Sequence, residues 1–222
     1  MGEDVNLPLW LQPLTQKLEE LTPASLSWQD VPKSVEREAA VLVLIGPHEE
    51  HGEIIIIERP SHMRNHAGQP AFPGGQVDPV DGSATATALR ESREEISLMP
   101  NSIDVIAELP QLWIPPTRFK VTPVLAWWKD PHDLAIADEQ EVRAIHRIPI
   151  ARLANPENRV RIQTRSGYLG DAFTIDHMII WGFTAGVISR LMDLALWSVP
   201  WDTQRIVQIP DTDVQESDTV VP

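Results

Sequence analysis

Hydrophobic residues in this chain form short runs separated by polar and proline-rich segments. Two runs of β-branched and aliphatic residues, 39–45 and 53–58, flank a turn that contains Gly46-Pro47 and Gly52. Runs of this length predict buried strands, and the turn predicts that they form a hairpin. Further strands are predicted at residues 103–109, 121–129, 141–148, 160–164 and 172–175. The last two are expected to form a terminal hairpin.

Helical spacing of apolar residues predicts four helical segments. An amphipathic N-terminal helix is expected at 9–21, a helix at 84–98 with Ser83 as its N-cap, and a last helix at 184–196. A short turn of helix is expected at 150–154, after a proline. Several successive strands between helices, with few β-α-β alternations, predict an α/β protein whose mixed sheet lies between helical layers.

Composition is that of one folded domain with additions at both ends. The chain has 222 residues, of which 42% are hydrophobic and 23% charged, so a substantial core can form. We place the domain at 37–198, after an N-terminal helix and connector at 1–36. Residues 199–222 are acidic and contain prolines, and they are expected to form a tail that packs on the surface or stays disordered.

Charge and the absence of certain residues exclude some classes of protein. The net charge of −14 argues against a nonspecific nucleic-acid binder, which normally has a basic face. No run approaches the ~18 apolar residues of a membrane span. No basic or apolar leader pattern follows Met1, so we expect no secretory signal. The chain has no cysteine, which excludes disulfides and thiolate metal sites. We therefore expect no nucleic-acid or membrane partner.

The segment 90–96, which reads Arg-Glu-Ser-Arg-Glu-Glu-Ile, concentrates three carboxylates. On a helix, Glu91, Glu94 and Glu95 lie within an arc of roughly 100°. Leu89, Ser92 and Ile96 lie together on a different arc, which is expected to pack inward. Like charges at this spacing destabilise a helix, so the pattern favours a bound cation. Carboxylate oxygens suit Mg²⁺ or Mn²⁺. The alternative interpretation is a solvated helix face held by Arg–Glu ion pairs.

This segment and the glycine before it resemble the Nudix box. Gly75 matches the glycine that opens the box, Arg90-Glu91 and Glu94-Glu95 match its acidic core, and Leu98 matches its closing aliphatic residue.

The segment departs from the box at four points. Asp81 stands where a glutamate is usual, and one extra residue separates it from Arg90. Ser92 replaces an aliphatic residue, and Ser97 replaces the closing glycine. Because serine is less free than glycine to adopt a positive φ, the end of this helix is expected to be built differently.

The preceding segment, RPSHMRNHAGQPAFPGG at 59–75, resembles the signature that precedes the Nudix box in coenzyme A pyrophosphatases. The matching residues are Arg59, Arg64, Gly68, Phe72, Gly74 and Gly75. Segments 117–124 and 181–185 resemble later parts of that subfamily. The resemblance extends from about residue 38 to residue 195.

The resemblance implies a Nudix-type α/β/α sandwich and a catalytic site that needs Mg²⁺ or Mn²⁺. It implies that Glu91, Glu94, Glu95 and the Gly75 carbonyl hold the metal, while Arg90 keeps the acidic cluster in register. Nudix enzymes use either a glutamate of the box or a distant one as general base. The best distant candidate is Glu141.

The reaction implied is hydrolysis of coenzyme A or acyl-CoA to 3′,5′-ADP and (acyl-)4′-phosphopantetheine in the cytoplasm. The residues matching the upstream signature are expected to bind the substrate, with Arg59 or Arg64 on a phosphate. Two alternatives stay open: hydrolysis of another nucleoside diphosphate derivative, and a catalytically silent Nudix scaffold that binds a nucleotide or a protein. His66 and Trp113 are lesser candidates for substrate contact, and the sequence leaves a homodimer open.

Overall fold

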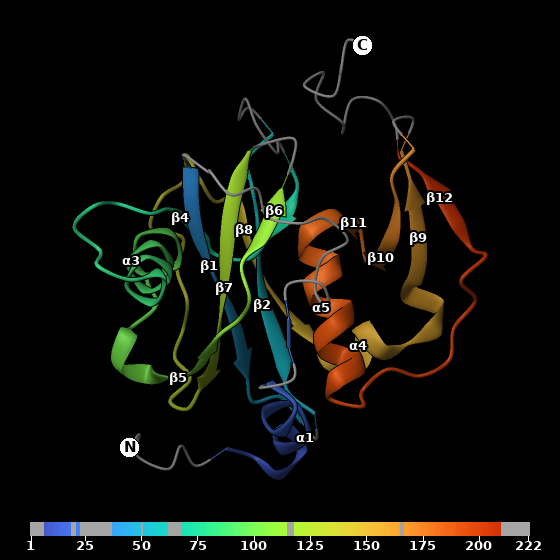
Figure 1. Cartoon of the computed structure of the whole chain (residues 1–222), viewed down its shortest axis with the longest axis horizontal. Helices are drawn as coiled ribbons and strands as arrows, with labels where there is room; N and C mark the ends of the chain where they lie inside the picture. Colours follow the sequence, from blue (N-terminus) through green and yellow to red (C-terminus); the bar gives the residue numbers. More distant parts are fainter. Residues whose placement is uncertain are drawn as a thin grey trace.

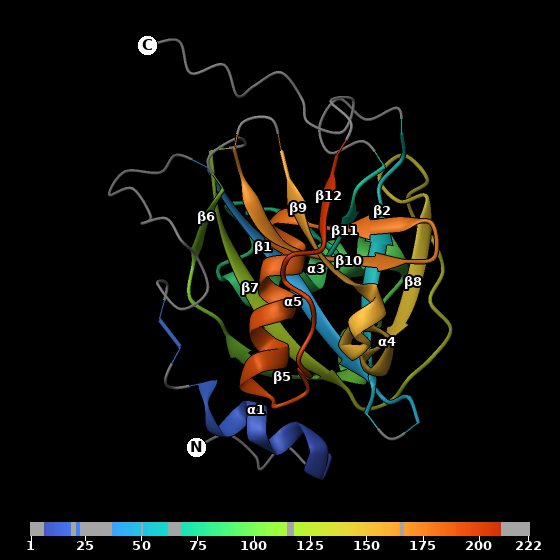
Figure 2. The ribbon, with the colours of Figure 1, turned by 90° about the vertical axis from the view of Figure 1, so that its right-hand side faces the viewer.

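The computed structural model describes residues 7–18, 21–22, 37–49, 51–61, 68–114, 118–164 and 167–209. A central sheet separates α3 (Ala84–Ile96) on one face from α4 (Ile150–Ala154) and α5 (Gly182–Leu194) on the other (Figure 1). The predicted α/β/α sandwich is confirmed. A second sheet, which the sequence pattern did not predict as a separate sheet, lies beyond α5 (Figure 2).

The central sheet has eight strands. They are β1 (Arg37–Gly46), β2 (Glu53–Glu58), β3 (Pro70–Ala71), β4 (Gly74–Gln76), β5 (Ile103–Glu108), β6 (Leu112–Ile114), β7 (Phe119–Trp128) and β8 (Ala144–Pro149). The order is β3-β2-β1-β7-β5, with β4 on β1, β6 on β7 and β8 on β2. The β1–β7 pair is parallel and the other pairs are antiparallel, so the sheet is mixed. The predicted hairpin of β1 and β2 is confirmed, with Ile45 opposite Ile54.

The second sheet has four strands in the order β11-β10-β9-β12. They are β9 (Arg159–Gln163), β10 (Leu169–Ile175), β11 (Met178–Ile180) and β12 (Ile206–Gln208). The predicted hairpin of β9 and β10 is confirmed. The predicted acidic tail contributes β12, which pairs in parallel with β9, and the buried Ile209. Residues 210–222 lie outside the described residues.

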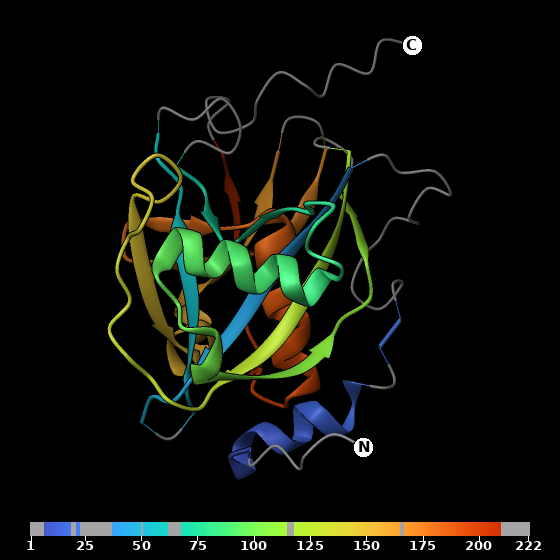
Figure 3. The same cartoon turned by 90° about the vertical axis from the view of Figure 1, so that its left-hand side faces the viewer.

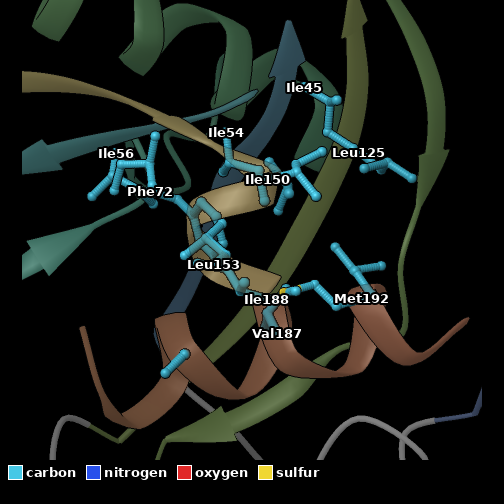
Figure 4. Close-up of a cluster of buried hydrophobic side chains, with 14 of the residues drawn as sticks. Ile45, Ile54, Ile56, Phe72, Leu125, Ile150, Leu153, Val187, Ile188 and Met192 are labelled. Carbon is cyan, nitrogen blue, oxygen red and sulfur yellow. The ribbon is translucent and has the colours of Figure 1, made fainter. Parts of the chain in front are cut away.

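Side chains on both faces of the central sheet are buried, which explains why β1 reads as a nearly continuous apolar run. Val43 and Ile45 face the cluster beneath α5, whereas Leu42 and Leu44 face the cluster beneath α3. Figure 4 shows part of the first cluster, in which α5 packs against the sheet. Figure 3 shows α3 lying across the opposite face.

The N-terminal helix predicted at 9–21 is shorter than expected. It consists of a 3₁₀ turn, η1 (Leu9–Leu11), and α1 (Gln12–Gln16). The buried Leu11 and Leu14 anchor it, while Leu18 and Leu21 pack on the same cluster from outside the helix. The apolar spacing therefore predicted the buried residues but not the end of the helix. Two further 3₁₀ turns are η3 (Pro100–Ser102) and η4 (Pro156–Asn158).

Candidate active site

Both ends of α3 are fixed by local hydrogen bonds. Ser83 is the N-cap, as predicted, and its Oγ accepts from the Ala86 N–H at 3.1 Å. At the other end Ser97 itself adopts the left-handed conformation, with φ +56° and ψ 29°. Its N–H donates to Arg93 O, and the Leu98 N–H donates to Ser92 O. The expectation that Ser97 would force a different helix end is therefore wrong, because the serine takes the conformation that glycine usually supplies.

The three glutamates of α3 lie at different depths. The side chain of Glu95 is 1% exposed, that of Glu91 14% and that of Glu94 59%. On the packing side, Ser92 and Ile96 are buried and Leu89 is half-buried against the cluster beneath α3. The predicted packing arc is confirmed. The carboxylates extend from the interior to the surface rather than forming a uniformly exposed face.

Arg90 connects two of these glutamates to the loop that precedes the helix. Its Nε and Nη2 donate to the two carboxylate oxygens of Asp81 at 2.8 and 2.9 Å. Its Nη1 donates to Glu91 at 2.9 Å and to Glu94 at 3.0 Å. The hydrogen bonds from Arg90 hold the pKa of Asp81 far below its usual range. Arg90 therefore links Glu91 and Glu94 to Asp81, a partner that the sequence had not identified.

Glu95 lies under the glycine pair that opens the box. Its Oε2 accepts from the Gly74 N–H at 2.8 Å, and Arg59 Nη2 lies 3.8 Å from its Oε1. Arg59 also donates to Gly74 O at 3.3 Å. Burial raises the pKa of Glu95 to about 8, although Arg59 and the Gly74 N–H oppose the shift; the nearby charges of Glu91 and Glu141 add to it. This carboxyl can therefore exchange a proton near neutral pH.

The raised pKa predicts how the stability of the metal-free protein depends on pH. The folded protein binds the Glu95 proton more tightly than the unfolded chain, so the contribution to stability is complete below about pH 4.5 and is lost as pH rises through about 8. We expect the free energy of unfolding to lose up to about 1.4 kcal/mol per pH unit from this group within that window. Glu95→Gln should remove this slope in denaturant titrations with EDTA.

Glu94→Gln is the matched control for that experiment, because the Glu94 side chain is mostly exposed. It should keep the slope of the wild-type protein. A slope that is the same in the wild-type protein and in Glu95→Gln would show that Glu95 is not the titrating group.

Glu91 packs directly against Gly75. A Cβ atom at residue 75 would lie 2.5 Å from both Cδ and Oε1 of Glu91, so only glycine leaves room for this carboxylate. Burial raises the pKa of Glu91, and the charges of Glu141 and Glu94 act in the same direction while Arg90 opposes them. The Gly75 backbone and the Glu91 carboxylate are thus close neighbours, as the proposed metal site requires.

Glu141 approaches the same cluster from a distant part of the chain. It lies in the loop between β7 and β8, and this loop is anchored to the end of α3 by the Ala137 N–H, which donates to Glu95 O at 3.0 Å. Glu141 is exposed, and its charge influences both Glu91 and Glu95. The structure therefore brings the predicted distant glutamate to the box.

Two further residues of the upstream signature, Gly68 and Phe72, lie in the part of the chain that the structure describes. Gly68 precedes Gln69, whose carbonyl accepts from the Arg59 N–H at 3.2 Å. Phe72 is 2% exposed and points into the core beside Ile56 (Figure 4). The prediction that Phe72 binds substrate is corrected on this point, since a buried ring can only support the loop by packing.

Three other candidates are not placed at the site. Arg64 and His66 lie outside the described residues. Trp113 is half-buried on β6, at the opposite edge of the sheet from β8.

Comparisons with known proteins identify the family. The NUDIX domain family profile matches residues 36–166. The chain is 39% identical over 163 residues to a protein of Escherichia fergusonii named "Uncharacterized Nudix hydrolase NudL", covering 70% of this chain and 81% of the relative. The protein of the same name from Escherichia coli K12 is 38% identical with the same coverage. The chain belongs to the Nudix hydrolase family.

The fold agrees with a solved Nudix structure. The NUDIX hydrolase from Alicyclobacillus acidocaldarius aligns with a TM-score of 0.53 and 18% identity, over 73% of this chain and 93% of that one. The names of the NudL relatives state no substrate. The comparisons therefore establish the Nudix domain and the hydrolase family. They do not establish the coenzyme A subfamily.

Nudix hydrolases generally use a divalent metal such as Mg²⁺ or Mn²⁺, and the donor set of this site suits such an ion. Glu95 Oε1 is buried without a hydrogen-bond partner, which is a costly state for a carboxylate oxygen. Within the described ranges, however, no three His, Cys, Asp or Glu side chains already surround a common point. Arg90 holds Glu91 and Glu94, so these two would have to reorient to join Glu95 around a cation.

Among the helices that the structure describes, none is long and apolar enough to cross a membrane.

Proposed function

We propose that this Nudix hydrolase cleaves the diphosphate linkage of coenzyme A or acyl-CoA, giving 3′,5′-ADP and (acyl-)4′-phosphopantetheine. The observation that carries the proposal is the position of Arg59. This arginine belongs to the upstream signature, and its guanidinium lies 3.8 Å from the buried carboxylate of Glu95. The signature loop therefore leads into the glutamate cluster, where a guanidinium can bind a diphosphate.

In the proposed reaction, water attacks one phosphorus of the diphosphate, the bond from that phosphorus to the bridging oxygen breaks, and the bridging oxygen leaves with the other phosphate. Glu91, Glu94, Glu95 and the Gly75 carbonyl would hold the divalent ion, which neutralises charge on the phosphate oxygens when bound. Arg59 would bind and orient the diphosphate. The positive charge of the Arg59 guanidinium matters because the net charge of −14 repels an anionic substrate.

Two carboxylates are candidates for the base that takes the proton from water. Glu141 is exposed and close enough for its charge to affect the cluster, so substrate can reach it. Glu95, with its pKa of about 8, can accept a proton near neutral pH. We propose Glu141, because Glu95 is buried and is needed for the cation. A cytoplasmic location is proposed together with this substrate.

A substrate panel tests the proposal. We expect CoA to be cleaved with a higher kcat/KM than ADP-ribose, nucleotide sugars or 8-oxo-dGTP in the presence of Mn²⁺, because only CoA is matched by the upstream signature. The products should be resolved as 3′,5′-ADP and 4′-phosphopantetheine. Glu95→Gln protein prepared in the same way controls for contaminating hydrolases.

Each contrary result has a distinct meaning. A tenfold advantage of ADP-ribose or a nucleoside triphosphate over CoA, equal to about 1.4 kcal/mol of transition-state preference, would overturn the subfamily assignment and leave the Nudix chemistry intact. No turnover of any compound would favour a silent scaffold.

A further inference from the structure

A hollow of about 340 Å³ is lined in part by residues that directly follow Arg59 and Glu141 in the chain, and its volume is within the roughly 300–1,000 Å³ range of ligand pockets. The residues that line it come from two segments far apart in the sequence, namely Pro60, Ser61, Ile136, Glu139, Val142 and Arg143. The signature did not single out Arg143. Its position two residues after Glu141 was the sequence signal that could have pointed to it.

Both walls of the hollow continue from residues of the candidate active site. Pro60 and Ser61 follow Arg59, which lies beside Glu95. Val142 and Arg143 follow Glu141, whose loop is hydrogen-bonded to the end of α3. A substrate whose diphosphate contacts Arg59 and the glutamates therefore has the hollow within reach of one of its two ends.

Arg143 is fixed at the rim of this hollow. Its Nη1 donates to Glu58 Oε1 at 3.1 Å, and its backbone N–H donates to Glu58 O at 2.8 Å. The Glu58 side chain is 7% exposed, so it is a rigid anchor, whereas the Arg143 side chain is 61% exposed. Glu58 Oε2 is also approached by His146 Nε2 at 3.3 Å. The hydrogen bond to Glu58 uses Nη1 of the guanidinium. Because most of the Arg143 side chain is exposed, a ligand can reach the guanidinium from solvent.

The lining indicates the chemistry of the ligand. Pro60, Ile136 and Val142 give the hollow apolar surface, and Ile136 is a partly exposed large hydrophobic residue. Arg143 contributes the cation of the lining and Glu139 contributes a carboxylate, in a protein of net charge −14. A planar or apolar group that carries a phosphate fits this combination.

We propose that the hollow binds the nucleoside end of the substrate and that Arg143 binds a phosphate on that nucleoside, beyond the scissile diphosphate. The inference rests on the proposed function, and for CoA the phosphate is the 3′-phosphate. The two arginines then have separate roles, since Arg59 lies at the diphosphate and Arg143 at the distal phosphate.

Kinetics with two substrates test this role. We expect Arg143→Gln to lower kcat/KM on CoA by about tenfold to a hundredfold, chiefly through KM, and to leave 3′-dephospho-CoA nearly unaffected. Arg143→Lys keeps the charge and should recover part of the loss. Arg147→Gln is the matched control, because Arg147 on β8 also pairs with a buried glutamate of β2, Glu53, and does not line the hollow. An equal loss on both substrates, or no loss on CoA, would overturn the assignment.

A binding measurement separates this inference from the proposed function. By calorimetry without metal, wild-type protein should bind adenosine 3′,5′-bisphosphate more tightly than AMP. Arg143→Gln should lose that preference, and Arg147→Gln should keep it. If CoA is not cleaved but the preference depends on Arg143, the proposed function fails while the phosphate site stands. If wild-type protein shows no preference, or Arg143→Gln retains it, the phosphate site is wrong.

Discussion

Glu94→Gln and Glu95→Gln are each expected to lose about a hundredfold or more of the diphosphatase activity while folding normally. Changes to groups that merely orient a metal ligand cost 10- to 100-fold in metal affinity or activity, so loss of a ligand should reach at least the upper end of that range. The two glutamates differ in burial, since the side chain of Glu95 is buried and that of Glu94 is exposed. Steady-state rates at saturating Mn²⁺ provide the measurement.

The unfolding temperature in EDTA shows whether these losses reflect misfolding. Glu95→Gln removes a buried ionisable carboxyl but keeps an oxygen for the Gly74 N–H, so its unfolding temperature should hold or rise. Glu157→Gln, a change of an exposed glutamate on η4, is the control and should keep full activity. Full activity in both site variants would show that these glutamates are not ligands.

Replacing the two glycines of the box with alanine is expected to give opposite results. Gly75→Ala should abolish most of the activity with a small effect on stability, because the three atoms nearest to the new Cβ all belong to the end of the Glu91 side chain, which can be displaced. Gly74→Ala should destabilise the fold, because Gly74 has φ +149° and the new Cβ would lie 2.6 Å from Val41 Cα on β1.

Chemical denaturation and turnover, measured on both variants, separate the two effects. Gly74→Ala should lower the free energy of unfolding by several kcal/mol, of the order expected for a strained backbone with a steric clash. Normal kcat in Gly75→Ala would contradict the view that the Glu91 carboxylate must lie against the Gly75 backbone.

Local patterns predicted α3 well, because its cap, its packing arc and its charged residues all lie within one short segment. The hairpin of β1 and β2 could be predicted equally well, since two apolar runs flank a short turn. The second sheet was not predicted, because β11 and β12 have only three residues each and depend on partners distant in the sequence. Its position beyond α5 is set by tertiary packing.

The candidate site shows the same division. The sequence located the three glutamates, but a helical arc gives only their directions, and the burial of Glu95 depends on how α3 packs on β4. Phe72 was assigned to substrate contact because it belongs to a resembling signature, whereas its ring packs in the core. Arg143 was missed because its anchor, Glu58, is 85 residues away in the chain.

The central claim is that the glutamates of α3 hold a divalent cation that the hydrolysis requires, and metal removal tests it most directly. Wild-type protein is stripped with EDTA, and diphosphate hydrolysis of CoA and ADP-ribose is followed before and after Mn²⁺ or Mg²⁺ is restored. We predict no turnover without metal and recovery on its addition, with Glu95→Gln failing to recover. Wild-type rates in excess EDTA would contradict the account.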